Sequence, residues 1–286
     1  MEKLGKLLKG ESLLAIIMAV IGFVSLSNIT HALWIVLSLA MINFILYIVK
    51  VIYKNNTFAL ITLTTLYSVT VVTSVIAATK IIRFDIRGIT NWFFSGEMTV
   101  PAGVIVYAVS FLITDLISEV FGKKKAIFAV LLGFVSMLIF SLYSLLMVGW
   151  QPASYWEGQE SFNSIVGLSL RITFAGWISF LISQHWDVAI FHWLKRKNEI
   201  PQTDTNTPST TPAKWLLFRN TLSTVTSQLI DSTLFISIAF LGIYDNELVV
   251  SMVLAQWLIK CIVALIDTPF AYLGRNILLK KDGKEI

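Results

Sequence analysis

Long apolar stretches separated by short polar connections dominate the sequence. A helix that crosses the roughly 30 Å hydrocarbon core of a bilayer needs about 20 mostly apolar residues. Eight stretches approach or exceed this length, and we predict a membrane helix for each. They cover, to within a few residues, 13–26, 32–53, 58–78, 98–121, 126–149, 164–194, 215–243 and 248–273. The predicted fold class is therefore all-α, a polytopic membrane protein with about eight transmembrane helices.

The first stretch is the shortest of the eight and follows Lys3, Lys6 and Lys9. A signal peptide has the same order of basic and apolar regions, so it is the alternative interpretation of this segment. No clear A-x-A cleavage site follows, and the next apolar stretch begins soon afterwards. We therefore expect a membrane helix here, and we predict a two-helix extension over residues 1–57 ahead of a core over 58–286.

Two connections differ from the short loops. Residues 195–214 hold three prolines and five threonines, a composition typical of a flexible linker. Residues 80–97 alternate apolar and charged side chains around Gly88, which predicts a small external hairpin on the membrane surface. The aromatic run from Trp92 to Phe94 would then lie at the membrane interface. The alternative for this hairpin is a plain structured loop without a role in transport.

Composition agrees with a membrane protein. Of the 286 residues, 56% are hydrophobic and 14% are charged, whereas a soluble domain usually carries about 25% charged residues. These values exclude a soluble enzyme, a disordered chain and a nucleic-acid-binding domain. The single cysteine, Cys261, excludes an internal disulfide, and the three histidines are too scattered for an ordinary zinc or haem site. We predict no catalytic residue, no metal and no cofactor.

Basic residues are unevenly distributed between the predicted connections. If both termini are cytoplasmic, 17 of the 22 lysines and arginines lie on the cytoplasmic side, and only Lys80, Arg83 and Arg87 lie outside. Basic loops favour the cytoplasmic side, so this asymmetry predicts a multi-pass protein of the cell (plasma or inner) membrane with both termini in the cytoplasm. Topology explains the net charge of +5, and nucleic acid is not an expected partner.

Seven ionisable side chains lie within the predicted spans. A charge at the bilayer centre costs about 2.5–3.5 kcal/mol on insertion scales, so such residues are retained where they face a cavity, a partner or a substrate. For any single residue a structural ion pair explains the charge equally well, but the whole set favours a polar cavity. Five acids against two bases leave a formal charge of −3, which implies bound protons, a bound cation or a cationic substrate. The seven are Asp115, Glu119, Arg171, Asp187, Asp231, Lys260 and Asp267.

Helical spacing places these residues on common faces, because residues three, four or seven apart share one side of a helix. Four predicted helices each carry a polar stripe. If the stripes face one another, they enclose a polar site about midway through the membrane. The stripes are Asp115 and Glu119; Ser179, Ser183 and Asp187; Asn220, Thr224, Ser227 and Asp231; and Gln256, Lys260 and Asp267.

A short pattern also repeats within the chain. S-Q-x-x-D-x-x-x-F begins at Ser183 and again at Ser227, 44 residues later. By the predicted topology the two copies cross the membrane in opposite directions, as inverted repeats of transporters do. Each copy places a glutamine one helical turn from an aspartate. These pairs are Gln184 with Asp187 and Gln228 with Asp231.

A glutamine beside an aspartate suits a guanine-like ring. The carboxylate can accept the two adjacent donors of such a ring, and the amide can donate to the neighbouring carbonyl. The aromatic residues Trp186, Phe191 and Phe235 are candidates for stacking on a flat ring. Ordinary packing or lipid-facing surface is the alternative for these three aromatics.

Several motifs resemble the queuosine-precursor transporter family, also called the vitamin uptake transporter family. The run FLITDLISEVFGKKK, from Phe111 to Lys125, resembles the family motif F-L-x-T-D-x-x-x-E-V-Y-G-K-K. The segments Gln184–Phe191 and Arg219–Phe235, together with Lys260, match further family positions in the same order. The resemblance extends over roughly residues 58–275.

The resemblance implies an importer of 7-deazaguanine precursors of queuosine, such as the 7-cyano and 7-aminomethyl compounds. The chain departs from the family at Tyr107-Ala108, where an aromatic–Pro pair is common, and at Ser74-Val75, where a Ser-Asn pair is common. We expect Arg171, Arg219 and Asp267 to be structural anchors. The predicted substrate-binding residues are Asp115, Glu119, Gln184, Asp187, Asn220, Ser227, Gln228, Asp231 and Lys260.

Import of a queuosine precursor, by facilitated or proton-coupled transport, is the leading functional hypothesis. The alternative is the substrate-capture subunit of an energy-coupling vitamin importer, which would need an ATPase-driven partner. A membrane-embedded enzyme would need a nucleophile–base pair or a metal cluster, and the sequence shows neither spacing. The expected partners are a small deazapurine and the lipid bilayer, and a homodimer is left open.

Overall fold

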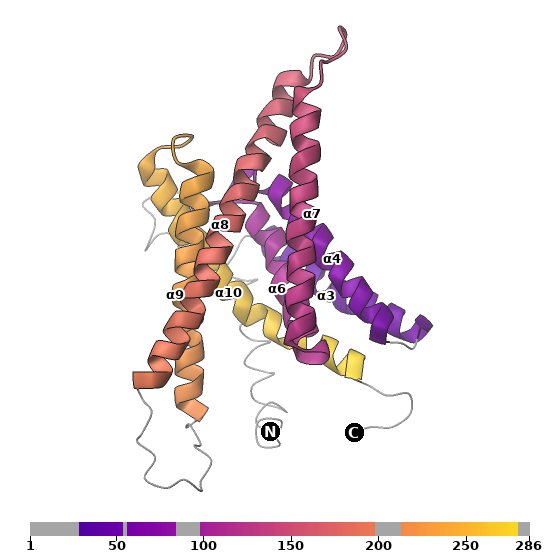
Figure 1. The fold of residues 1–286 in the computed structure, drawn as a ribbon, viewed down its shortest axis with the longest axis vertical. Helices are drawn as coiled ribbons and strands as arrows, with labels where there is room; N and C mark the ends of the chain where they lie inside the picture. Colours follow the sequence, from indigo (N-terminus) through magenta and orange to yellow (C-terminus); the bar gives the residue numbers. More distant parts are fainter. Residues whose placement is uncertain (1–28, 54–55, 84–97, 198–212, 280–286) are drawn as a thin grey trace, which may run out of the picture.

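The structure, a computed structural model, describes residues 29–53, 56–83, 98–197 and 213–279 (Figure 1). These residues form seven helices and two short strands. The strands are β1 (Ile81–Arg83) and β2 (Thr99–Pro101). The helices are α3 (Ile29–Tyr53), α4 (Asn56–Ala77), α6 (Gly103–Phe121), α7 (Lys123–Gly149), α8 (Gln159–Lys197), α9 (Ala213–Phe240) and α10 (Asn246–Leu279).

The helices correspond to the second to eighth predicted spans, and the all-α membrane fold is confirmed. Segments of α4, α6, α7, α8 and α10 are long and apolar enough to cross a membrane. The apolar segments of α3 and α9 are shorter, Ile35–Val49 and Thr224–Phe240. The first predicted span, residues 13–26, lies outside the described residues.

The fourth predicted span begins later than expected. Residues 99–101 form strand β2, and α6 begins at Gly103, because Pro101 disfavours the helical conformation for Val100 before it and favours an extended one. β2 pairs antiparallel with β1, with Ile81 opposite Pro101. These two strands form the base of the predicted hairpin over 80–97, while residues 84–97 lie outside the described part of the chain.

Two groups of helices pack against each other. α8 and α9 run side by side, and α10 crosses obliquely and contacts both α9 and α6 (Figure 1). α4, α6 and α7 form the second group, and α7 also contacts α8. α7 and α8 extend beyond the other helices at the end where they approach each other (Figure 1). The outer face of α7 is apolar and exposed, as lipid contact requires, with Phe128, Leu131, Leu142 and Leu145 on the surface.

Two glycines make this packing feasible. Gly122 joins α6 to α7 with a φ of 90°, a conformation that strains any residue with a Cβ atom, so the chain can reverse without a loop. Gly103 lies where α6 meets α4, and a methyl group there would overlap the Ser74 carbonyl oxygen and the Ala78 side chain. The close contact between α4 and α6 beside the central cavity therefore depends on Gly103.

The predicted division of the chain stays a prediction. α3, the second helix of the predicted extension over 1–57, packs on α4, α6 and α10. In the predicted linker over 195–214, α8 continues to Lys197 and α9 begins at Ala213. The linker residues between these helices, 198–212, lie outside the described residues.

Candidate binding cavity

A cavity lies between the two groups of helices and receives side chains from α4, α6, α7, α8, α9 and α10. Its empty space of about 710 Å³ includes a part that is open to solvent. Most of its wall is apolar or aromatic. The aromatic members are Tyr67, Tyr107, Phe134, Phe180 and Phe235, and the polar members include Ser74, Ser179, Asp231, Gln256 and Lys260.

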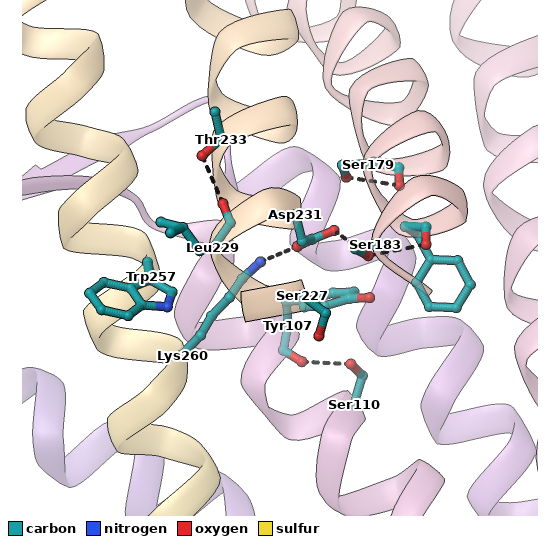
Figure 2. A network of polar contacts seen from close by, with 12 residues as sticks. Tyr107, Ser110, Ser179, Ser183, Ser227, Leu229, Asp231, Thr233, Trp257 and Lys260 are labelled. Carbon is teal, nitrogen blue, oxygen red and sulfur yellow. Dashed lines mark hydrogen bonds and ion pairs between the residues drawn. The ribbon is translucent and has the colours of Figure 1, made fainter. Parts of the chain in front are cut away.

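An ion pair forms the centre of the polar part of this wall. The Lys260 ammonium, from α10, donates to Asp231 Oδ2, from α9 (Figure 2). Both side chains are largely buried, with exposed fractions of 6% for Lys260 and 15% for Asp231. Ser183 of α8 lies on the other side of the carboxylate, with its Oγ 3.5 Å from Asp231 Oδ1. One carboxylate thus contacts both neighbouring helices.

Desolvation makes this pairing necessary. Removing a charge from water is expensive, and a partner of opposite sign offsets part of that cost. The pair is formally neutral, so the wall carries a strong dipole without a net charge. The carboxylate can accept about four hydrogen bonds, and the described residues contribute the Lys260 bond and the longer Ser183 contact. Asp231 can therefore accept further donors from a ligand.

A tryptophan fixes the relative position of α9 and α10 at this pair. Trp257 Nε1 donates to the Val225 carbonyl oxygen over 3.1 Å. Trp257 is three residues before Lys260 and Val225 is six before Asp231, so this bond lies close to the ion pair along both helices. It sets the register in which the lysine meets the aspartate.

Gln256 is a second polar group in the cavity wall. It precedes Lys260 by four residues on α10, so both side chains lie on one face of that helix. Its exposed fraction is 2%. Among the residues that the structure describes, none forms a hydrogen bond with its amide. The amide is thus nearly removed from solvent yet faces an open space.

The structure separates the residues of the predicted stripes. Asp231 and Lys260 lie at the cavity, and Ser227 is buried nearby with its hydroxyl donating to the Thr224 carbonyl oxygen over 2.9 Å.

The predicted substrate-binding glutamines do not line the cavity. Gln228 is partly buried, and its Oε1 is buried without a hydrogen-bond partner among the described residues. Gln184 is exposed. The side chains of Asp187, Arg219 and Asn220 lie outside the described residues.

The acids of α6 do not reach the cavity. Glu119 is exposed and pairs with Arg275 of α10, whose Nε lies 3.1 Å from Glu119 Oε1. Asp115 is also exposed. Asp267 of α10 is buried and lies close enough to Asp115 for the two charges to interact. The predicted roles of these residues stay predictions.

Arg171 contacts the end of α9. Its Nε donates to the Ile238 carbonyl oxygen and its Nη2 to the Leu241 carbonyl oxygen, both over 2.6 Å. The last carbonyls of a helix have no partner within the helix, so this arginine satisfies two such groups and joins α8 to α9. It lies outside the cavity wall.

Several residues of the cavity wall were absent from the predicted site. Gln256 belonged to a recognised polar stripe, and its spacing from Lys260 could have identified it. Tyr67 and Tyr107 gave no signal, because an aromatic residue in a membrane helix is equally compatible with lipid, packing or a cavity. Phe235, one of the predicted stacking residues, lines the cavity, whereas Trp186 is exposed.

No group of three metal-ligating side chains lies together within the described ranges.

The sequence of this chain is similar to a described protein family and to a curated protein. Residues 101–274, which include α6 to α9 and most of α10, match a family described as a putative vitamin uptake transporter. The chain is 30% identical over 181 residues to the probable queuosine precursor transporter of Bacillus subtilis (strain 168). The match covers 63% of this chain and 74% of that relative. No solved structure matches the chain.

Proposed function

Since the chain belongs to the family of putative vitamin uptake transporters and is a multi-pass membrane transporter, we propose that it imports a queuosine precursor of the 7-deazaguanine class. The candidates are the 7-cyano and 7-aminomethyl compounds. The relative from Bacillus subtilis has a name that gives the same substrate class. The family is described as one of transporters.

The observation that carries the proposal is the buried Asp231 in an aromatic cavity. A 7-deazaguanine presents two adjacent N–H donors, the ring N1–H and the 2-amino group. A carboxylate accepts such a pair in the plane of the ring, and charge-assisted hydrogen bonds of this kind are about twice as strong as neutral ones. Lys260 compensates the charge of Asp231, which offsets part of the cost of holding this acceptor away from solvent.

The aromatic walls supply the remaining recognition. Tyr67, Phe180 and Phe235 come from three different helices and surround the same space. A flat heterocycle gains from offset or edge-to-face contact with such rings, about 0.5–1.5 kcal/mol for each pair beyond area burial. Walls of this kind suit a planar base.

Uptake by the chain alone tests the proposal. In cells that lack both synthesis and uptake of the precursor, the protein should restore queuosine in tRNA when 7-cyano- or 7-aminomethyl-7-deazaguanine is supplied. Restoration without any ATPase partner supports a transporter, whereas a strict need for such a partner would support a substrate-capture subunit. With the uncharged 7-cyano compound as the substrate, an ionophore that collapses the proton gradient separates the two modes of transport, because only proton-coupled uptake should fall.

The Asp231→Asn variant tests the site itself. An amide cannot accept both donors, so uptake of labelled precursor should fall to the level of cells without the protein. Thr233→Ala is the matched control, because Thr233 is exposed on the same helix and its hydroxyl donates to the Leu229 carbonyl oxygen, away from the ion pair (Figure 2). Equal amounts of both variants in the membrane are required. Full uptake by Asp231→Asn would remove this residue from the site.

A further inference from the structure

We infer that Gln256 is a specificity-determining residue that recognises the ring carbonyl of the substrate, at position 6 of the base. This inference rests on the proposed function and deepens it. The sequence analysis placed the recognising amide at Gln184 or Gln228, next to the aspartates of the repeat. The structure places Gln184 on the surface and Gln228 away from the cavity wall.

The first step of the argument is the state of the Gln256 amide. It is 98% buried, it lines the cavity, and none of the described residues hydrogen-bonds to it. Buried amides in folded proteins almost always have partners, because an unpaired one retains the full cost of desolvation. An amide that faces an open cavity without a protein partner is therefore expected to bond to whatever fills that cavity.

The second step is position. Gln256 and Lys260 are one helical turn apart on α10, which separates their Cβ atoms by about 5–6 Å. Lys260 in turn contacts Asp231 across the cavity wall. The amide and the carboxylate are therefore within reach of one small ring that lies against this part of the wall.

The third step is complementarity. One edge of a 7-deazaguanine presents two donors followed by a carbonyl acceptor. Asp231 offers two acceptor oxygens, and the amide nitrogen of Gln256 offers a donor, so the two side chains match the three groups in order. A ring with an amino group at position 6 has a donor in place of the carbonyl and an unprotonated ring nitrogen in place of N1–H. It therefore loses the bond to the amide nitrogen and one bond to Asp231.

The experiment uses the full chain, purified in detergent, with labelled 7-cyano-7-deazaguanine as the probe. The unlabelled competitors are three related rings. 7-Deazaguanine keeps the whole edge, 7-deazahypoxanthine lacks only the 2-amino group, and the 2,6-diamino analogue replaces the carbonyl and also lacks the N1 proton. The ratio of the dissociation constants for 7-deazaguanine and the diamino analogue, here called the position-6 preference, therefore combines recognition of the carbonyl by Gln256 with recognition of N1–H by Asp231, and only the first part should change when Gln256 is replaced. The ratio for 7-deazaguanine and 7-deazahypoxanthine measures recognition of position 2.

Replacing Gln256 with Met, which has nearly the same shape, should lower the position-6 preference about tenfold, the effect of one lost hydrogen bond in a buried site. The position-2 preference should stay unchanged. Gln256→Glu removes the donor and adds an acceptor, so it should lower the position-6 preference further. Thr233→Ala is the control, because Thr233 is exposed and does not line the cavity, and it should change neither ratio.

The outcomes separate the two proposals. If the wild-type protein binds none of the three rings, the proposed function fails whatever the role of Gln256. If wild-type protein binds 7-deazaguanine and Gln256→Met keeps the full position-6 preference, the inference is wrong and another donor recognises the carbonyl. An equal loss of affinity for all three competitors would indicate a merely structural residue and would also overturn it. If Gln256→Met does not fold, the same ratios are measured on Gln256→Asn, whose shorter amide should likewise weaken the position-6 preference.

Discussion

Two acid–base pairs join α10 to other helices, and their surroundings are opposite. Lys260 meets Asp231 in the cavity wall, where the exposed fractions are 6% and 15%. Arg275 meets Glu119 near the ends of α10 and α6, where they are 41% and 59%. The chemical groups are similar, but only the first pair is shielded from solvent and borders an open space. Burial, and not the presence of an ion pair, distinguishes a candidate binding group from a surface contact.

The largest loss of stability and of uptake should follow from breaking the Lys260–Asp231 ion pair. Lys260→Met leaves Asp231 without its counter-charge, and breaking a buried pair usually costs about 3–5 kcal/mol. The free energy of unfolding, measured by titrating the purified protein with SDS, should fall by about that amount, and uptake should be lost.

The double variant sharpens this result. Adding Asp231→Asn to Lys260→Met removes the orphaned charge, so most of the stability should return while uptake stays absent. A double variant as unstable as the single one would show that Lys260 contributes mainly through packing, and the contrast between the two pairs would then lose its physical basis.

An intermediate loss of unfolding free energy is expected on replacing Arg171, whose guanidinium bonds to backbone carbonyls instead of to a carboxylate. Arg171→Met removes two bonds from a charged donor to the Ile238 and Leu241 carbonyl oxygens. Hydrogen bonds to charged groups contribute about 1.5–3 kcal/mol when buried, and one of these two is exposed, so a total loss of about 2 kcal/mol is expected in the same SDS titration. Uptake per folded molecule should be retained, because Arg171 does not line the cavity. A loss of uptake at full stability would place Arg171 in the transport mechanism.

The smallest effect is expected at the exposed pair. Exposed ion pairs are screened by solvent and contribute about 0–1 kcal/mol. Glu119→Gln should therefore change the unfolding free energy by less than about 0.5 kcal/mol and leave uptake within about twofold of wild type. Arg275→Gln should behave in the same way. An uptake defect in Glu119→Gln alone would show that this carboxylate has a role that its pairing does not explain.

The apolar pattern was sufficient to predict the helices. Seven of the eight predicted spans coincide with described helices to within a few residues at most ends, because membrane helices need long apolar runs that little else in a sequence imitates. The start of α6 was an error of element type, because residues predicted to be helical form a strand. There the apolar run continues through Met98 and Val100, although these residues belong to the hairpin and not to the helix.

The binding site was harder to predict from the sequence than the helices were. Helical spacing grouped residues by face, and it correctly placed Gln256 with Lys260. It could not tell which face points inward, because the interior and the lipid surface of a membrane protein are both apolar. Gln184 shows the limit. It follows Ser183, which contacts Asp231, yet a step of one residue turns it by about 100° to the exposed side.

The neutrality of the Lys260–Asp231 pair has a consequence for energetics across the bilayer. One elementary charge that crosses the full potential exchanges about 2.3 kcal/mol for every 100 mV. Lys260 and Asp231 contribute zero when they move together, and an uncharged base adds nothing. As far as this pair is concerned, reorientation of the loaded or the empty protein is electroneutral. For an uncharged base carried without a coupled ion, such as the 7-cyano compound, voltage then has no influence on the direction of flow, whereas the 7-aminomethyl compound carries a protonated amine and its flow would respond to voltage.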